Sequence, residues 1–101
     1  MQNYAQLSKY IAYVQQAHDA ACRRYALSHY LSRDMLTVRD SPRNAINALH
    51  LQRQLEEVIQ ADTEMRAALD RANQAAVLCG KPVLSPDALI PLPVTLNPIS
   101  P

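Results

Sequence analysis

The sequence predicts an all-α protein: an antiparallel two-helix hairpin, coiled-coil-like, followed by an extended proline-rich C-terminal tail. The 101-residue chain has one glycine, Gly80, whereas sandwiches and barrels need turn glycines and phosphate loops need glycine-rich runs. Apolar residues recur at steps of three and four in two long stretches, as in amphipathic helices. Six of the seven prolines follow residue 80. With 49% apolar residues and a formal net charge of +1, the chain resembles neither a disordered polymer nor a basic nucleic-acid tail.

The first helix is predicted over about residues 3–36, a stretch that contains neither proline nor glycine. The β-branched Thr37 and Val38 weaken helical preference, so we expect a turn at residues 37–41. Residues at alternating steps of three and four form one apolar stripe on this helix: Tyr4, Leu7, Ile11, Val14, His18, Ala21, Tyr25, Ser28, Ser32 and Met35.

The second helix is predicted over about residues 42–79. Ser41 suits the N-cap position and Pro42 the first helical position. Gly80 suits the left-handed residue that ends a helix, and Pro82 prevents its continuation. A break at Asp62, which can cap a shorter helix, is an alternative. The stripe of this helix is Ala48, Leu51, Leu55, Val58, Asp62, Met65, Leu69, Ala72, Ala76 and Cys79.

The two stripes predict how the helices pair. If the chain bends near Asp40, facing residues have numbers that sum to about 80, so Tyr25 meets Leu55. The same rule brings together the ionisable position of each stripe, His18 and Asp62. We therefore expect these two side chains to form a hydrogen-bonded pair between the helices.

Further small and apolar residues flank both stripes, and a lone hairpin looks too small to bury them all. Residues 1–80 form the predicted hairpin, and residues 81–101 form a tail long enough to run back along it. The covering element can be this tail, a different protein or a second copy; we expect a homodimer that forms a four-helix bundle. The flanking residues are Tyr10, Tyr13, Ala17, Ala20, Leu27 and Leu31 on the first helix and Ala61, Ala68 and Ala75 on the second.

Two cysteines are too few for a disulfide scaffold, and no segment resembles a signal peptide or a membrane span. We therefore expect a cytoplasmic protein without a membrane association. His18 and Cys22, four residues apart, could bind zinc together with Asp62. A structural histidine beside a small thiol is the simpler interpretation, so no metal or cofactor is expected. His29 and His50 are expected to be solvated.

The function predicted from these features is non-enzymatic protein binding, as in an adaptor, an antiactivator or a secretion chaperone. Tyrosine is a frequent contact anchor, and an extended apolar tail can dock in a groove. The expected contact residues are Tyr10, Tyr13, Leu27, Tyr30, Leu31, Leu89, Ile90, Leu92 and Val94. The alternative is a small dimeric regulator that binds nucleic acid through an arginine-rich turn end, with Arg33, Arg39, Arg43 and Arg53.

Overall fold

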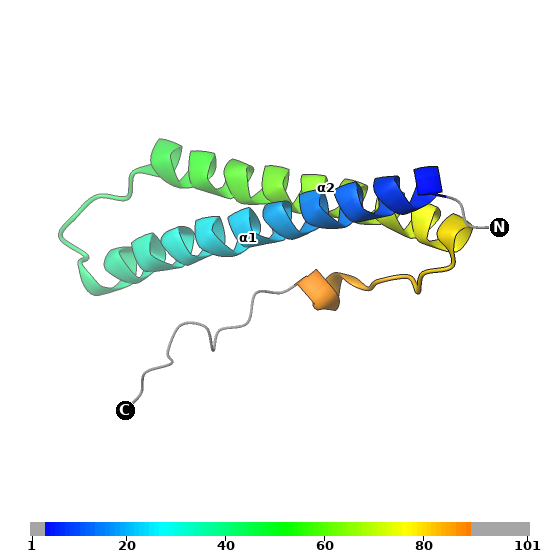
Figure 1. Cartoon of the computed structure of the whole chain (residues 1–101). Coiled ribbons are helices and arrows are strands. Elements are labelled where there is room, and N and C mark those ends of the chain that lie inside the picture. Colours follow the sequence, from blue (N-terminus) through cyan, green and yellow to red (C-terminus); the bar gives the residue numbers. More distant parts are fainter. Residues whose placement is uncertain (1–3, 90–101) are drawn as a thin grey trace, which may run out of the picture.

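The computed structural model describes residues 4–89 and shows two long helices packed side by side in opposite directions (Figure 1). Helix α1 spans Tyr4–Asp40 and helix α2 spans Ala48–Cys79. A single 3₁₀ turn, η1, spans Pro86–Leu89. No strand occurs within residues 4–89. The predicted all-α hairpin is therefore confirmed.

The connection between the helices lies later in the chain than predicted. Helix α1 continues through Thr37, whose hydroxyl donates to the carbonyl of Arg33 at 3.2 Å and whose carbonyl accepts from the amide of Ser41. Ser41 and Pro42 do not begin a helix: the amide of Asn44 closes a single turn onto the Ser41 carbonyl at 3.0 Å. The turn therefore occupies residues 41–47, and the predictions of a turn at 37–41 and a helix start at residue 42 were wrong.

Both ends of α2 have clear local causes. The side chain of Asn47 accepts a hydrogen bond from the amide of His50 at 3.1 Å, which satisfies a donor that the first helical turn leaves free. At the other end Gly80 has φ 78°, and its amide and that of Lys81 both donate to the Ala76 carbonyl. This left-handed ending was predicted correctly. The helix runs without a break through Asp62.

The predicted pairing of the helices was shifted by several residues. Arg23 contacts Glu64, and Arg24 contacts Asp62, so the numbers of paired residues sum to 87 and 86 instead of 80. The shift follows from the turn, whose centre lies near residue 44 instead of residue 40. Tyr25 and Leu55, which were expected to face each other in the interface, are 45% and 49% exposed.

The side of α1 that faces α2 is mainly the flanking strip; of the predicted stripe, Ala21 alone is buried. Ala17 and Ala20 of this strip are buried, and its larger members are half-buried: Tyr10, Tyr13, Leu27 and Leu31. On α2 the predicted stripe and its alanine neighbours share the interface. The buried residues there are Ala61, Met65, Ala68, Leu69, Ala72, Ala75 and Ala76. Because alanine is small, it lets two helix backbones approach closely.

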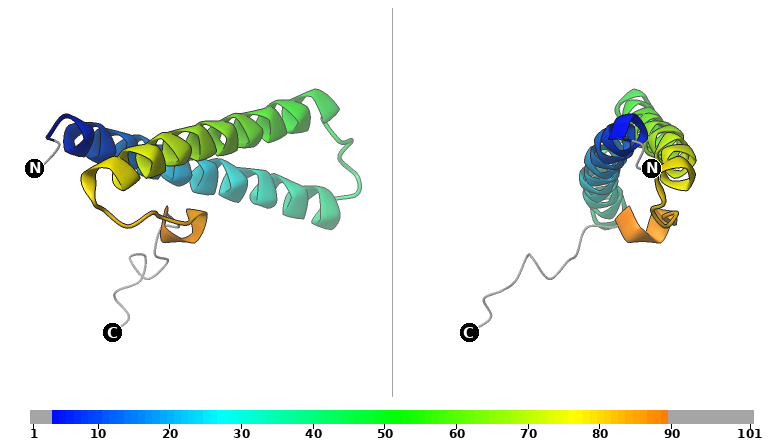
Figure 2. Two further views of the ribbon diagram at one scale, coloured as in Figure 1. Left: turned by 90° about the vertical axis from the view of Figure 1, so that its right-hand side faces the viewer. Right: turned by 45° about the vertical axis from the view of Figure 1, so that its right-hand side comes forward.

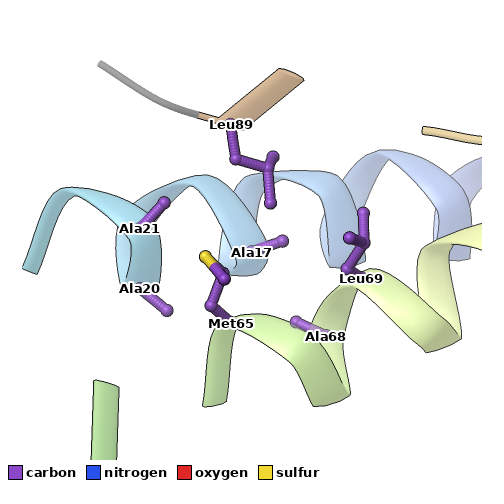
Figure 3. Close-up of a cluster of buried hydrophobic side chains, with 7 residues drawn as sticks. All are labelled: Ala17, Ala20, Ala21, Met65, Ala68, Leu69 and Leu89. Carbon is purple, nitrogen blue, oxygen red and sulfur yellow. The ribbon is translucent and has the colours of Figure 1, made fainter. Parts of the chain in front are cut away.

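The first part of the tail folds back onto the hairpin (Figure 2). The side-chain amide of Asn73 donates to the carbonyl of Leu84 at 2.9 Å and accepts from the amide of Leu84 at 2.8 Å. Leu89 is only 2% exposed and packs with alanines of α1 and with Met65 and Leu69 of α2 (Figure 3). The expectation of a wholly extended tail was wrong at η1, because Ala88 closes a turn onto the Ser85 carbonyl.

Candidate functional site

Two rows of side chains lead from the Leu89 site toward the turn. Ala21 of α1 and Met65 of α2 both belong to the cluster around Leu89 (Figure 3). From each of them, steps of three and four residues follow one side of the helix. We call these two rows together the open face; its residues are Ala21, Tyr25, Ser28, Ser32 and Met35 on α1 and Met65, Asp62, Val58, Leu55 and Leu51 on α2. They are the turn-side parts of the stripes that the sequence pattern defined.

Beyond the tail contact, the open face is poorly covered. No residue in the range 22–60 is buried among those that the structure describes. On the open face, Tyr25, Met35 and Leu55 each expose nearly half of their surface. Other large apolar side chains of the same half are also exposed: Tyr30, Leu36, Ile46, Leu49 and Ile59. Contiguous exposed apolar surface is a common feature of protein interaction sites.

A cavity marks the point where the open face begins. It has a volume of about 260 Å³ and lies between η1 and the two helices. Its walls combine apolar and charged side chains: Ala21, Arg24, Tyr25, Met65, Arg66, Pro86, Asp87 and Leu89. The cavity is therefore adjacent to the last described residue of the tail.

A charged cluster lies beside this cavity. Asp62 accepts hydrogen bonds from Arg24 Nε at 2.8 Å and from Arg66 Nε at 3.0 Å. The hydrogen bond from Arg66 is the main reason why the pKa of Asp62 lies below its ordinary value, and the positive charge of Arg24 adds to it. The expected pair of His18 and Asp62 was wrong. Instead, His18 Nδ1 lies 3.7 Å from Cys22 Sγ on the exposed side of α1.

This arrangement does not assemble the three zinc ligands that the sequence suggested. Asp62 is held by two arginines, away from the His18–Cys22 pair. Within residues 4–89, no group of three histidine, cysteine, aspartate or glutamate side chains is placed to hold a metal ion. Asp62, Arg24 and Arg66 therefore form an ion-paired cluster at the start of the open face.

A second polar group joins the helices near the turn. Asp34 accepts hydrogen bonds from Gln54 Nε2 at 2.7 Å and contacts His50 Nε2 at 3.0 Å. The bond from Gln54 is the largest cause of the lowered pKa of Asp34, followed by that from His50. The oxygen of the Gln54 side chain is buried without a partner. Polar contacts thus replace apolar packing here, and the sequence pattern did not reveal them, since His50 was expected to be solvated.

The residues predicted to bind a protein lie in different surroundings. Tyr10, Tyr13, Leu27 and Leu31 are half-buried on the α2 side of α1, and Arg71 lies 5.9 Å from the centre of the Tyr13 ring. Tyr30 is exposed and contacts His29 edge to face. Leu89 is buried against α1 and α2, so its surface is covered in this conformation. Ile90, Leu92 and Val94 lie outside the described residues.

The arginines of the nucleic-acid alternative are all exposed near the turn. Arg39 is already paired, because its guanidinium donates to both carboxylate oxygens of Asp40, at 2.7 and 3.0 Å. This contact raises the pKa of Arg39. Arg33, Arg43 and Arg53 remain as exposed positive charges around the turn.

Comparisons with models of protein families, with curated proteins and with solved structures find no match for the chain. In the part of the chain that the structure describes, neither long helix has a stretch apolar enough to cross a membrane.

Proposed function

We propose that this chain is a non-enzymatic protein-binding module that holds an apolar segment of another protein on the open face. The observation that carries the proposal is the contrast along the hairpin: residues 22–60 contain many large apolar side chains, yet none of them is buried. Covering a large apolar side chain completely is worth about 1.5–3 kcal/mol, so Tyr25, Met35 and Leu55 offer a partner substantial binding energy.

The composition of the open face fits an extended or helical peptide segment. Tyr25 offers an aromatic ring with a polar tip, a common anchor at protein interfaces. Arg24 and Arg66 line the adjoining cavity and can donate hydrogen bonds to a backbone carbonyl or an acidic side chain of the partner. A module of this kind can serve as an adaptor, an antiactivator or a secretion chaperone.

In a more specific version of this proposal, two copies of the chain form a homodimer with four packed helices. Leu89 and η1 cover the middle of the hairpin on the side of the open face. A second copy would therefore join through the turn half, where the apolar side chains are exposed. Light scattering across a range of concentrations distinguishes this dimer from a monomer.

The runner-up is binding of nucleic acid at the turn. The exposed Arg33, Arg43 and Arg53 favour it, while the pairing of Arg39 with Asp40 weakens it. Binding to phosphates falls steeply as salt rises, whereas apolar contacts persist. Titration with duplex DNA and RNA at two salt concentrations therefore separates the two functions.

The central test is purification of the tagged chain from its native host, with mass spectrometry of the proteins that accompany it. We expect the double variant Tyr25→Ser with Leu55→Ser to lose a partner that the wild type retains. Val77→Ser with Leu78→Ser is the matched control, because these side chains are 71% and 60% exposed near the end of α2. If the control loses the partner and the open-face variant retains it, the proposal is wrong.

A further inference from the structure

The described tail has a fixed direction along the hairpin. It leaves α2 at Gly80, is held at Leu84 by the two hydrogen bonds to Asn73, and is anchored by Leu89. Figures 1 and 2 show that this path runs from the end of the hairpin opposite the turn back toward its middle, next to α1 and α2. The segment that follows Leu89 therefore starts beside the cavity at which the open face begins.

The length of the remaining chain matches the length of the open face. From Ala21 to Met35, α1 rises by about 21 Å at 1.5 Å per residue. Residues 90–96 span about 22 Å at 3.1 Å per residue in an extended conformation. By the same measure Val94 lies about 16 Å beyond Leu89, and Leu55 lies about 15 Å along α2 from Met65. An extended segment that continues toward the turn would therefore have Val94 near the level of Leu55.

The sequence of this segment suits an apolar face between two helices. Ile90, Leu92, Val94 and Leu96 are apolar at every second position, and an extended backbone places alternate side chains on one side. Pro91 and Pro93 keep their preceding residues extended and lack amide donors that a dry contact would leave unpaired. The alternate positions Thr95 and Asn97 are polar, as expected for the side that faces water.

We propose that residues 90–101 of the same chain occupy the open face, with Leu92 and Val94 between the rows of α1 and α2. The tail then acts as a built-in occupant that a partner segment must displace. This inference rests on the proposed function only in its last step, the displacement. The seating of the tail is a property of the free chain and is tested without a partner.

Disulfide trapping tests the seating of the tail. In the full chain with Cys22→Ser and Cys79→Ser, the pair Leu55→Cys and Val94→Cys should oxidise to a cross-link within one chain. The matched control replaces Leu55→Cys with Glu56→Cys, an exposed position at the same height that points to a different side of α2. Because a disulfide needs its two Cβ atoms within about 4.5 Å, we expect about tenfold less cross-link in the control.

Two outcomes overturn the inference. Equal yields at positions 55 and 56 would show that the tail is not seated on the open face. A cross-link that forms only between two chains would show that a second copy supplies the segment. If no partner is ever found but the cross-link forms, the proposed function fails and the seating of the tail stands.

A second measurement covers the case in which the cysteine variants fold poorly. The full chain with Leu92→Asp and Val94→Asp is compared with wild type by backbone amide NMR. We expect shifts at Tyr25, Ser32 and Leu55, and far smaller ones with the control Thr95→Asp and Asn97→Asp. Shifts that are absent, or equal in both variants, would contradict the inference.

Discussion

The two halves of the hairpin are built differently. In the closed half, which comprises residues 4–21 and 61–89, alanines and two larger residues of α2 pack against alanines of α1, and Leu89 adds a third layer. In the turn half, residues 22–60, no residue is buried among those described, and Asp34 joins the helices through His50 and Gln54. Figure 1 shows the two ribbons further apart toward the turn.

The difference shows what brings two helices together over part of their length. Ala17, Ala20, Ala61, Ala68 and Ala75 leave no bulk between the backbones, so the helices approach and exclude water. In the turn half, Leu27 and Leu31 are only half-buried between the helices. The contact between Asp34 and His50 is largely exposed, and exposed ion pairs contribute little. The closed half therefore contains the buried core, whereas the large apolar side chains of the turn half are at most half-buried.

The largest difference in stability is expected when the same change, leucine to alanine, is made at one position in each half. Leu69→Ala removes a buried side chain from the closed half and should lower the free energy of unfolding by about 2–5 kcal/mol. Leu55→Ala, at a position about half-exposed, should cost less than Leu69→Ala. Urea denaturation of both variants measures the two values. Equal losses would mean that the halves do not differ in packing.

A second pair of variants tests the close approach of the helices. Ala17→Leu adds bulk at a position with 0% exposure and should destabilise the chain by about 1–3 kcal/mol. Ala26→Leu, on the exposed side of α1 in the turn half, should change the free energy of unfolding by no more than about 0.5 kcal/mol. Thermal denaturation followed by circular dichroism compares them. An Ala17→Leu variant as stable as wild type would rule out the tight alanine contact.

The third contrast concerns the contact between the closed half and the described part of the tail. Asn73→Ala removes both hydrogen bonds to the Leu84 backbone and leaves the amide and carbonyl of Leu84 without these partners. It should lower the free energy of unfolding by about 1–3 kcal/mol. Its exposed neighbour Gln74 provides the control, since Gln74→Ala touches neither bond. Urea denaturation reports the stability, and proteolysis near residue 84 should become faster only in the Asn73 variant. Identical behaviour of the two variants would mean that Asn73 does not hold the tail.

The smallest expected effect is a pH dependence of the free energy of unfolding that arises from Asp62, at the boundary between the halves. The pKa of Asp62 is lowered in the folded chain. The ionised carboxylate therefore adds to the free energy of unfolding above its unfolded pKa of about 3.9, and this stabilisation is lost as pH falls through the folded pKa. Asp62→Asn should remove this part of the acid sensitivity and lower stability at pH 7 by less than about 1 kcal/mol. Unfolding midpoints between pH 2 and 7 measure it, with Asp70→Asn as the exposed control. A profile unchanged by Asp62→Asn would contradict the assignment.

The sequence pattern predicted α2 better than α1, for a physical reason. On α2 the stripe and its alanine neighbours lie on adjoining sides, and together they include all the buried residues of the helix. On α1 two strips have similar spacing; the stripe that contains Tyr25 was expected at the interface, but Ala21 is the one residue of this stripe that is buried. The helices instead meet through Ala17 and Ala20, because alanines on both partners permit the closest contact.

The sequence predicted a helix end correctly where only one residue type fits the required backbone conformation. Gly80 adopts the left-handed conformation that it was predicted to adopt. The pair Ser41–Pro42 was less specific: it closes one turn, as does Ser85–Pro86, and neither continues into a long helix. The bonds between Asn73 and Leu84 join residues 11 apart, and no periodic pattern predicts them.

Native-state hydrogen exchange of the full chain tests the difference between the halves most directly. Amides of α2 at residues 65–76 should open only with global unfolding and exchange slowest, whereas amides at residues 51–59 of the same helix should exchange at least about tenfold faster. Uniform protection along α2, or slower exchange next to the turn, would show that the turn half is packed as firmly as the closed half.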